Sequence, residues 1–186
     1  MSTLINLADF SSNPYTQIGG LFAQTANSIP IVNTTVETTL LDGGVGSLTV
    51  PANAFKVGDS FVAYLGGLVS CLNNQGLTIR VKSGSVIIGN TGAITMPQCT
   101  NQHWDLQIRF TIRSIGAAGV AAIASFGQFT FSKDASLTYE GADYSTINNT
   151  TFDTTTSNAL AITAQWANAS ASNSIYSESF ILTKIY

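Results

Sequence analysis

Charge is what this sequence lacks most. Only seven Lys and Arg and ten Asp and Glu occur in 186 residues, so charged residues make up 9%, against about 25% in a typical soluble domain. The hydrophilic surface must therefore consist mainly of Ser, Thr, Asn and Gln. Such a neutral surface repels other chains weakly, which indicates that part of it is covered by partners in an assembly.

The shortage of basic residues excludes one class of function. Lys and Arg are spread thinly from Lys56 to Lys184, and the formal net charge is −3. A nucleic-acid-binding surface needs clustered basic side chains to neutralise phosphates. We therefore expect no nucleic-acid partner.

Long hydrophobic runs and export signals are also missing. Residues 1–10 hold no basic stretch followed by a sustained apolar stretch, so we expect no signal peptide. The longest run of small apolar residues, 116–124, falls well below the about 20 residues that span a bilayer. The sequence predicts no membrane insertion.

Side chains for catalysis or metal binding are scarce. The single histidine, His103, falls on the polar face of a predicted strand, and Cys71 and Cys99 are too few for a metal cluster or a disulfide framework. We expect both thiols to be reduced core residues, with a disulfide between them as the alternative. The acidic residues of a predicted loop, 132–153, match no calcium-loop spacing. The sequence therefore predicts no enzyme, cofactor or metal site.

Period-two alternation is what the sequence does have. Between His103 and Arg113 apolar and polar residues alternate strictly, as in a strand with one buried face. Similar runs, separated by turns rich in Gly and Asn, lie at 31–41, 61–72, 77–82, 85–88, 120–131, 158–167 and 174–186. We assign the Ala-rich stretch 117–124 to a strand as well. The pattern predicts an all-β fold, an antiparallel β-sandwich.

The chain divides into two parts. Residues 31–186 carry the alternation and form the predicted sandwich domain. Residues 1–30 contain two prolines and a Gly-Gly pair with weak alternation. We interpret them as an N-terminal arm that lies against the sandwich or a neighbouring subunit, or links to a larger particle.

The last predicted strand is apolar on both faces. Phe180, Leu182 and Tyr186 share one face, and Ile181 and Ile185 share the other. A strand covered on both sides cannot be a free edge, so we expect it in the middle of a sheet and near a subunit axis. This predicts a closed homo-oligomer.

Aromatic residues are the candidates for contacts. The predicted interface residues are Phe61, Tyr64, Phe126, Phe129, Phe180 and Tyr186. Tyr139 and Tyr144, both in the predicted loop 132–153, are candidates for an exposed ligand contact.

Three segments carry a resemblance. Residues 46–61 (GSLTVPANAFKVGDSF) and 164–175 (AQWANASASNSI) resemble strand and turn patterns in structural proteins of tailed phages and large DNA viruses. Residues 179–186 (SFILTKIY) resemble the closing strand of trimeric jelly rolls of the tumour-necrosis-factor and C1q type. The C1q type usually follows a collagen-like Gly-X-Y stalk, which is missing here.

The resemblance implies a jelly-roll topology and a homotrimer. It also implies a protein made in the host cytoplasm and carried in the virion, in contact with other virion proteins. Its expected role is capsid decoration or attachment to a host receptor or glycan. The alternative is a lectin-like carbohydrate-binding domain with exposed aromatics, Asn and Asp around a groove.

Overall fold

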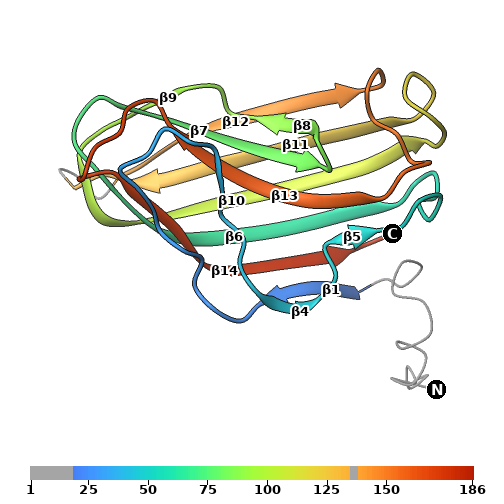
Figure 1. Cartoon of the computed structure of the whole chain (residues 1–186), viewed down its shortest axis with the longest axis horizontal. Coiled ribbons are helices and arrows are strands. Elements are labelled where there is room, and N and C mark those ends of the chain that lie inside the picture. Colours follow the sequence, from blue (N-terminus) through green and yellow to red (C-terminus); the bar gives the residue numbers. More distant parts are fainter. Residues whose placement is uncertain (1–18, 135–137) are drawn as a thin grey trace.

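The computed structural model describes residues 19–134 and 138–186. Within these ranges the chain forms fourteen strands and no helix. Every strand pair is antiparallel. The prediction of an all-β antiparallel sandwich is confirmed, and the long strands run along the longest axis of the molecule (Figure 1).

One sheet, here called the long sheet, has eight strands. Its order is β12-β11-β10-β6-β14-β1-β4, and β2 pairs with β14 outside this path. The bounds are β1 (Gly19–Gln24), β2 (Ile31–Val32), β4 (Gly44–Gly46), β6 (Ser60–Cys71), β10 (Cys99–Ser114), β11 (Ala122–Ser132), β12 (Tyr139–Asn148) and β14 (Ser174–Lys184).

The opposite sheet, here called the short sheet, has six strands in the order β3-β13-β7-β8, with β5 and β9 pairing with β13 and β7. The bounds are β3 (Thr38–Thr39), β5 (Thr49–Val50), β7 (Gln75–Ser83), β8 (Val86–Asn90), β9 (Ile94–Met96) and β13 (Asn158–Trp166). The chain passes from the long sheet to the short sheet and back repeatedly, which is consistent with the predicted jelly-roll topology.

The core lies between the inward faces of the two sheets. Alternate residues of a strand point to opposite faces, so each long strand gives every second side chain to this layer. Trp104 of β10 and Trp166 of β13 are almost completely buried there. Their indole N–H groups donate to the backbone carbonyls of Tyr176 and Ile31, at 3.2 and 3.3 Å, so neither leaves a polar group unsatisfied.

The strand β14 lies in the middle of the long sheet, between β6 and β1, as expected from its two apolar faces. Its inward face also holds a charge. Lys184 is 4% exposed, and its Nζ lies 2.7 Å from Oδ1 of the buried Asp59. The second oxygen of Asp59 accepts a hydrogen bond from the backbone N–H of Lys56. A buried lysine therefore has a partner carboxylate, the condition under which burial is tolerated.

Two predicted boundaries were wrong. The segment 132–153 is not one loop, because β12 pairs with β11 from Ile123 opposite Asn148 to Ser132 opposite Tyr139. The Ala-rich stretch 117–124 is only partly a strand. The N–H groups of Val120 and Ala121 both donate to the carbonyl of Ala117, which closes a turn before β11.

The predicted start of the sandwich at residue 31 falls inside the long sheet. Residues 19–24 form β1, which pairs with β14 on one side and with β4 on the other. Residues 1–18 of the predicted N-terminal arm lie outside the described residues.

Candidate functional site

The outward face of the long sheet carries the most conspicuous cluster of exposed large side chains. The strand register places Tyr64 of β6 between Gln107 of β10 and Ile181 of β14, and Arg109 opposite Phe126 of β11. Tyr64, Phe126 and Ile181 are 49%, 48% and 46% exposed. We call these five residues the central patch.

Several charges on this face have no ion-pair partner among the described residues. The guanidinium of Arg109 lies 5.8 Å from the ring centroid of Phe126, a distance at which a cation is attracted to the ring. Among the described residues Arg109 makes no ion pair, and neither do the exposed carboxylates of Asp143 and Glu178. The face therefore offers charge of both signs to a partner.

Two depressions flank Gln107, which lines both. The first has a volume of about 480 Å³ and includes Arg109, Phe126, Gln128 and Asp143 in its lining. It lies over β10, β11 and β12, and it combines an aromatic ring with amide, guanidinium and carboxylate groups.

The second depression has a volume of about 220 Å³ and lies over β6, β10 and β14. Its floor is at Gly66, where a Cβ would lie only 2.9 Å from Oδ1 of Asp105. Asp105 Oδ2 is 2.8 Å from Nε2 of His103 on the rim, and both side chains are about half exposed. Within the described part of the chain, no Ser, Thr or Cys side chain hydrogen-bonds to this imidazole.

The structure separates the six predicted interface residues into two groups. Tyr64 and Phe126 lie in the central patch. Tyr186 follows β14 and is 72% exposed. The other three, Phe61, Phe129 and Phe180, are at most 4% exposed and fill the core between the sheets. These three cannot contact another subunit in the folded chain, so the prediction that they are interface residues is wrong.

The two predicted ligand-contact tyrosines also differ. Tyr139 begins β12 and is 70% exposed, but Tyr144 is 8% exposed. The Tyr144 ring lies over two glycines, because a Cβ at Gly127 or Gly89 would come within 2.6 or 2.3 Å of it. Burial raises the pKa of Tyr144 to about 12. The prediction of an exposed contact at Tyr144 is therefore wrong, and this residue instead packs β12 against β8.

Sequence reasoning missed Arg109 and Ile181 as members of the exposed cluster. Arg109 was assigned only to the wet face of its strand, and Ile181 only to the second apolar face of β14. A signal for the cluster is present in β6, where Val62 and Tyr64 alternate with Phe61 and Ala63. A strand that is apolar on both faces must be covered on both.

The described residues hold no group of three or more His, Cys, Asp and Glu side chains arranged to bind a metal ion. In the same ranges no helix is long and apolar enough to cross a membrane.

Comparisons with known proteins give no identification. No protein-family model, curated protein or solved structure matches this chain. The resemblance to virion proteins and to trimeric jelly rolls therefore stays a prediction.

Proposed function

We propose that this chain is a non-catalytic structural module that assembles into a closed homo-oligomer through the outward face of the long sheet. The central patch carries this proposal, because Tyr64, Phe126 and Ile181 stand half exposed on the outward face of β6, β11 and β14. Exposed apolar side chains that gather on one face mark contact surfaces, and Tyr is enriched among residues that dominate binding energy.

A second copy of the chain is the partner that fits the patch. Arg109 and the carboxylates of Asp143 and Glu178 lie on the same face and are unpaired within the described residues. When two such faces meet, the guanidinium of one copy can pair with a carboxylate of the other. Closed rotational symmetry then leaves no apolar patch open for unlimited growth.

The expected oligomer is a trimer. The charges and the patch require a partner copy but do not set the number of copies. The choice of three rests on the resemblance of residues 179–186 to the closing strand of trimeric jelly rolls.

Assembly is tested by placing a charge on each sheet. Ile181→Asp introduces a carboxylate in the central patch, and Thr78→Asp introduces one at an outward position of the middle strand β7 of the short sheet. At low micromolar concentration, sedimentation velocity should show a trimer for the unmutated chain and Thr78→Asp, and a folded monomer for Ile181→Asp. A monodisperse monomer for the unmutated chain would overturn the proposal, and a dimer would leave assembly standing but remove the trimer.

The proposed location is the virion, where the oligomer decorates the capsid or mediates attachment. The support is the resemblance of residues 46–61 and 164–175 to virion structural proteins. Mass spectrometry of purified particles of the virus or phage that encodes the chain should recover it in stoichiometric amounts. Recovery only in the particle-free lysate would contradict this location.

Glycan binding is the second candidate function, favoured by the first depression. Its lining sets the ring of Phe126 beside Gln107, Gln128 and Asp143, a stacking surface with amide and carboxylate hydrogen-bonding groups. A glycan array with the unmutated chain and Phe126→Ala tests it. Binding that is lost in the variant, from a chain that sediments as a monomer, would favour this function over assembly, since the same face cannot serve both.

A further inference from the structure

The two cysteines lie opposite each other in neighbouring strands. Cys71 is the last residue of β6, Cys99 is the first of β10, and the two are direct partners in the antiparallel register. Directly opposite residues in such a pair have Cα atoms about 4.5 to 5.5 Å apart, which lies within the range that disulfides span. The two Sγ atoms are 3.4 Å apart. A covalent bond between them requires only small side-chain movements.

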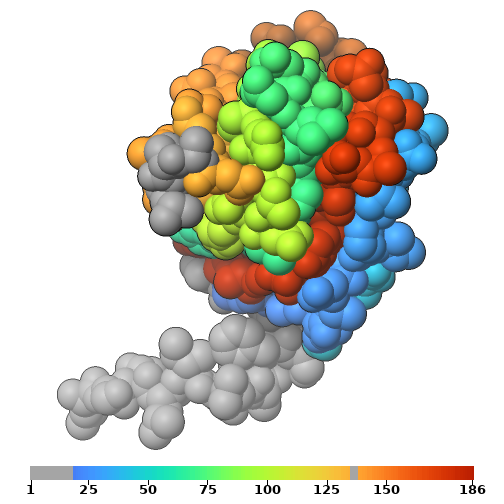
Figure 2. Space-filling model, turned by 90° about the vertical axis from the view of Figure 1, so that its left-hand side faces the viewer, coloured from blue at the N-terminus to red at the C-terminus, as the bar shows by residue number. Residues whose placement is uncertain are grey.

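The pair is buried but can be reached. Cys71 and Cys99 are 3% and 2% exposed. A depression of about 260 Å³ next to them is lined by both cysteines together with Leu72, Thr100 and Ser172. It lies at the end of the sandwich that Figure 2 faces, where the loop after β6, the start of β10 and the loop before β14 meet. A small reagent can approach the sulfurs from this side.

The two thiols are not equivalent. A hydrogen bond from the Cys71 thiol holds the pKa of Cys99 below its ordinary value. The same hydrogen bond, with burial, raises the pKa of Cys71. Since the thiolate is the nucleophile in disulfide exchange, Cys99 is the attacking sulfur.

We propose that Cys71 and Cys99 form an oxidative modification site that closes to an intrachain disulfide by exchange with a small disulfide such as oxidised glutathione. The Cys99 thiolate attacks one sulfur of the reagent, whose S–S bond breaks and releases a thiolate. That thiolate takes the proton of Cys71, and the Cys71 sulfur then displaces the second half of the reagent from Cys99. Two cysteine thiols are oxidised, and the reagent is reduced to two thiols.

The bond would join two adjacent strands of the long sheet and close a loop that carries three strands of the short sheet. The chain between Cys71 and Cys99 contains β7, β8 and β9 of the short sheet, and both cysteines belong to the long sheet. A disulfide that closes this loop restricts the unfolded chain, which raises stability if the folded geometry is unstrained.

The test is incubation of the native full chain with oxidised glutathione, followed by intact-mass analysis, peptide mapping and thermal unfolding. We expect both thiols to disappear together with the loss of two hydrogens, and a peptide that links Cys71 to Cys99. The unfolding midpoint should rise by about 5 to 10 °C over the reduced chain. Unreacted thiols, a persistent glutathione adduct or a disulfide between chains would each overturn the proposal, and so would a bond that forms only in denaturant.

Two serine variants serve as matched controls. Cys71→Ser keeps the attacking sulfur and should stop at a glutathione adduct on Cys99. Cys99→Ser keeps only Cys71 and should likewise form no intrachain disulfide. A rise of the unfolding midpoint in either variant equal to that of the unmutated chain would overturn the link between disulfide closure and stability. Circular dichroism shows whether each variant is folded, and the unmutated chain decides the proposal by itself if either is not.

Discussion

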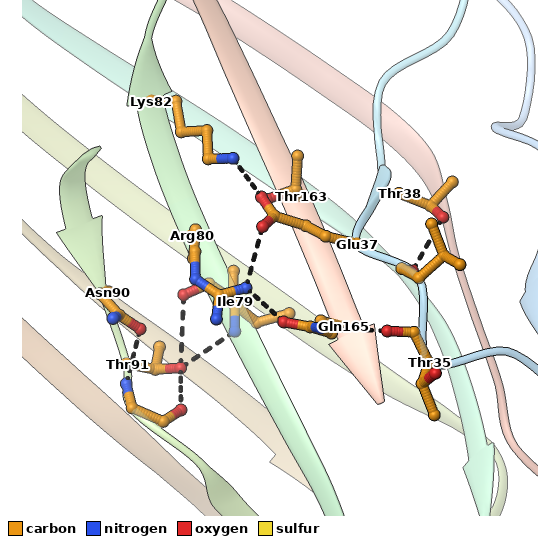
Figure 3. Close-up of polar contacts among 12 residues, drawn as sticks. Thr35, Glu37, Thr38, Ile79, Arg80, Lys82, Asn90, Thr91, Thr163 and Gln165 are labelled. Carbon is orange, nitrogen blue, oxygen red and sulfur yellow. Dashed lines mark hydrogen bonds and ion pairs between the residues drawn. The ribbon is translucent and has the colours of Figure 1, made fainter. Parts of the chain in front are cut away.

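The outward faces of the two sheets differ in how far their charged side chains are paired. On the short sheet, Glu37 pairs with Arg80 at 3.2 Å and with Lys82 at 2.5 Å. It also accepts a hydrogen bond from the hydroxyl of Thr163, and Arg80 donates a second bond to Gln165 (Figure 3). On the long sheet His103 and Asp105 pair with each other, but Arg109, Asp143 and Glu178 make no ion pair among the described residues and lie on the face that holds half-exposed apolar side chains.

In the assembly that we propose, this difference distinguishes a solvent face from a contact face. A surface that satisfies its own polar groups gains little from a partner, because bringing one up would only replace bonds already made. A surface with unpaired charges beside aromatic rings gains both burial and ion pairs when it is covered. The predictions below test the contrast, beginning with the largest expected effect.

Substitutions at two neighbouring residues of β14 should distinguish its inward face from its outward face by their effect on stability. Phe180 is 1% exposed and Ile181 is 46% exposed. Phe180→Ala should lower the free energy of unfolding by about 3 to 5 kcal/mol because it leaves a cavity in the core, whereas Ile181→Ala should lower it by less than about 1 kcal/mol. Urea unfolding of both variants at a protein concentration at which the oligomer is dissociated measures this. Similar losses would show that β14 has no distinct outward face.

Truncating the central aromatic side chain should weaken assembly without unfolding the chain. We expect Tyr64→Ala to cost about 2 kcal/mol of association free energy, or about a thirtyfold higher dissociation constant, as for interface residues that dominate binding. Thr78→Ala on the short sheet is the matched control and should leave association unchanged. Sedimentation over a concentration series gives the dissociation constants of both variants. Equal effects of the two substitutions on association would show that the two outward faces do not differ as contact surfaces.

The polar network of the short sheet should contribute modestly to stability and only above acidic pH. The hydrogen bond from Lys82, then that from Thr163, holds the pKa of Glu37 below its ordinary value of 4.5. A carboxyl with a lowered pKa in the folded state stabilises it above the ordinary value, and this contribution is lost as the pH falls through the lowered pKa. Glu37→Gln should therefore cost about 0.5 to 1 kcal/mol at pH 7 and less at pH 3, which lies below the ordinary pKa. Urea unfolding at the two pH values checks this, and an equal cost at both would contradict it.

The smallest expected effect concerns Arg109 and Phe126 within one chain. Removing the cation with Arg109→Gln should cost about 0.5 kcal/mol of monomer stability, as for an exposed cation above a ring. In a Phe126→Leu background the same substitution should cost nothing further. A double-mutant cycle at a concentration below dissociation measures the coupling, and additive losses would show that the two side chains do not interact.

Period-two alternation was enough to predict the long central strands but not the strand at the edge of the sheet. The run from His103 to Arg113 lies wholly within β10, because that strand packs one face on the core along its length. By contrast, β12 was predicted as loop. It is the last strand of the sheet with one partner, and only Tyr144 of its ten residues is buried. An edge strand that buries one side chain leaves almost no period-two signal.

The pattern also could not decide which apolar face of a strand is inward. In β6 and β14 both faces are apolar, so Phe61 and Phe180 were assigned to an interface although they lie in the core. Lys184 shows the same limit, since its burial depends on Asp59, which lies far away in the sequence. The central patch itself depends on register between four strands, and no local sequence pattern encodes that register.

The position of β14 sets an order of events during synthesis. This strand is the last of the described strands to leave the ribosome, yet it lies between β6 and β1. Until residues 174–184 emerge, both neighbours have a free backbone edge toward the gap that β14 will fill. The nascent chain therefore has an unpaired edge on β1, and on β6 once that strand has been made, until β14 is synthesised. A chaperone that covers them, or slow pairing with the wrong chain in its absence, would decide how much of this protein reaches the folded state.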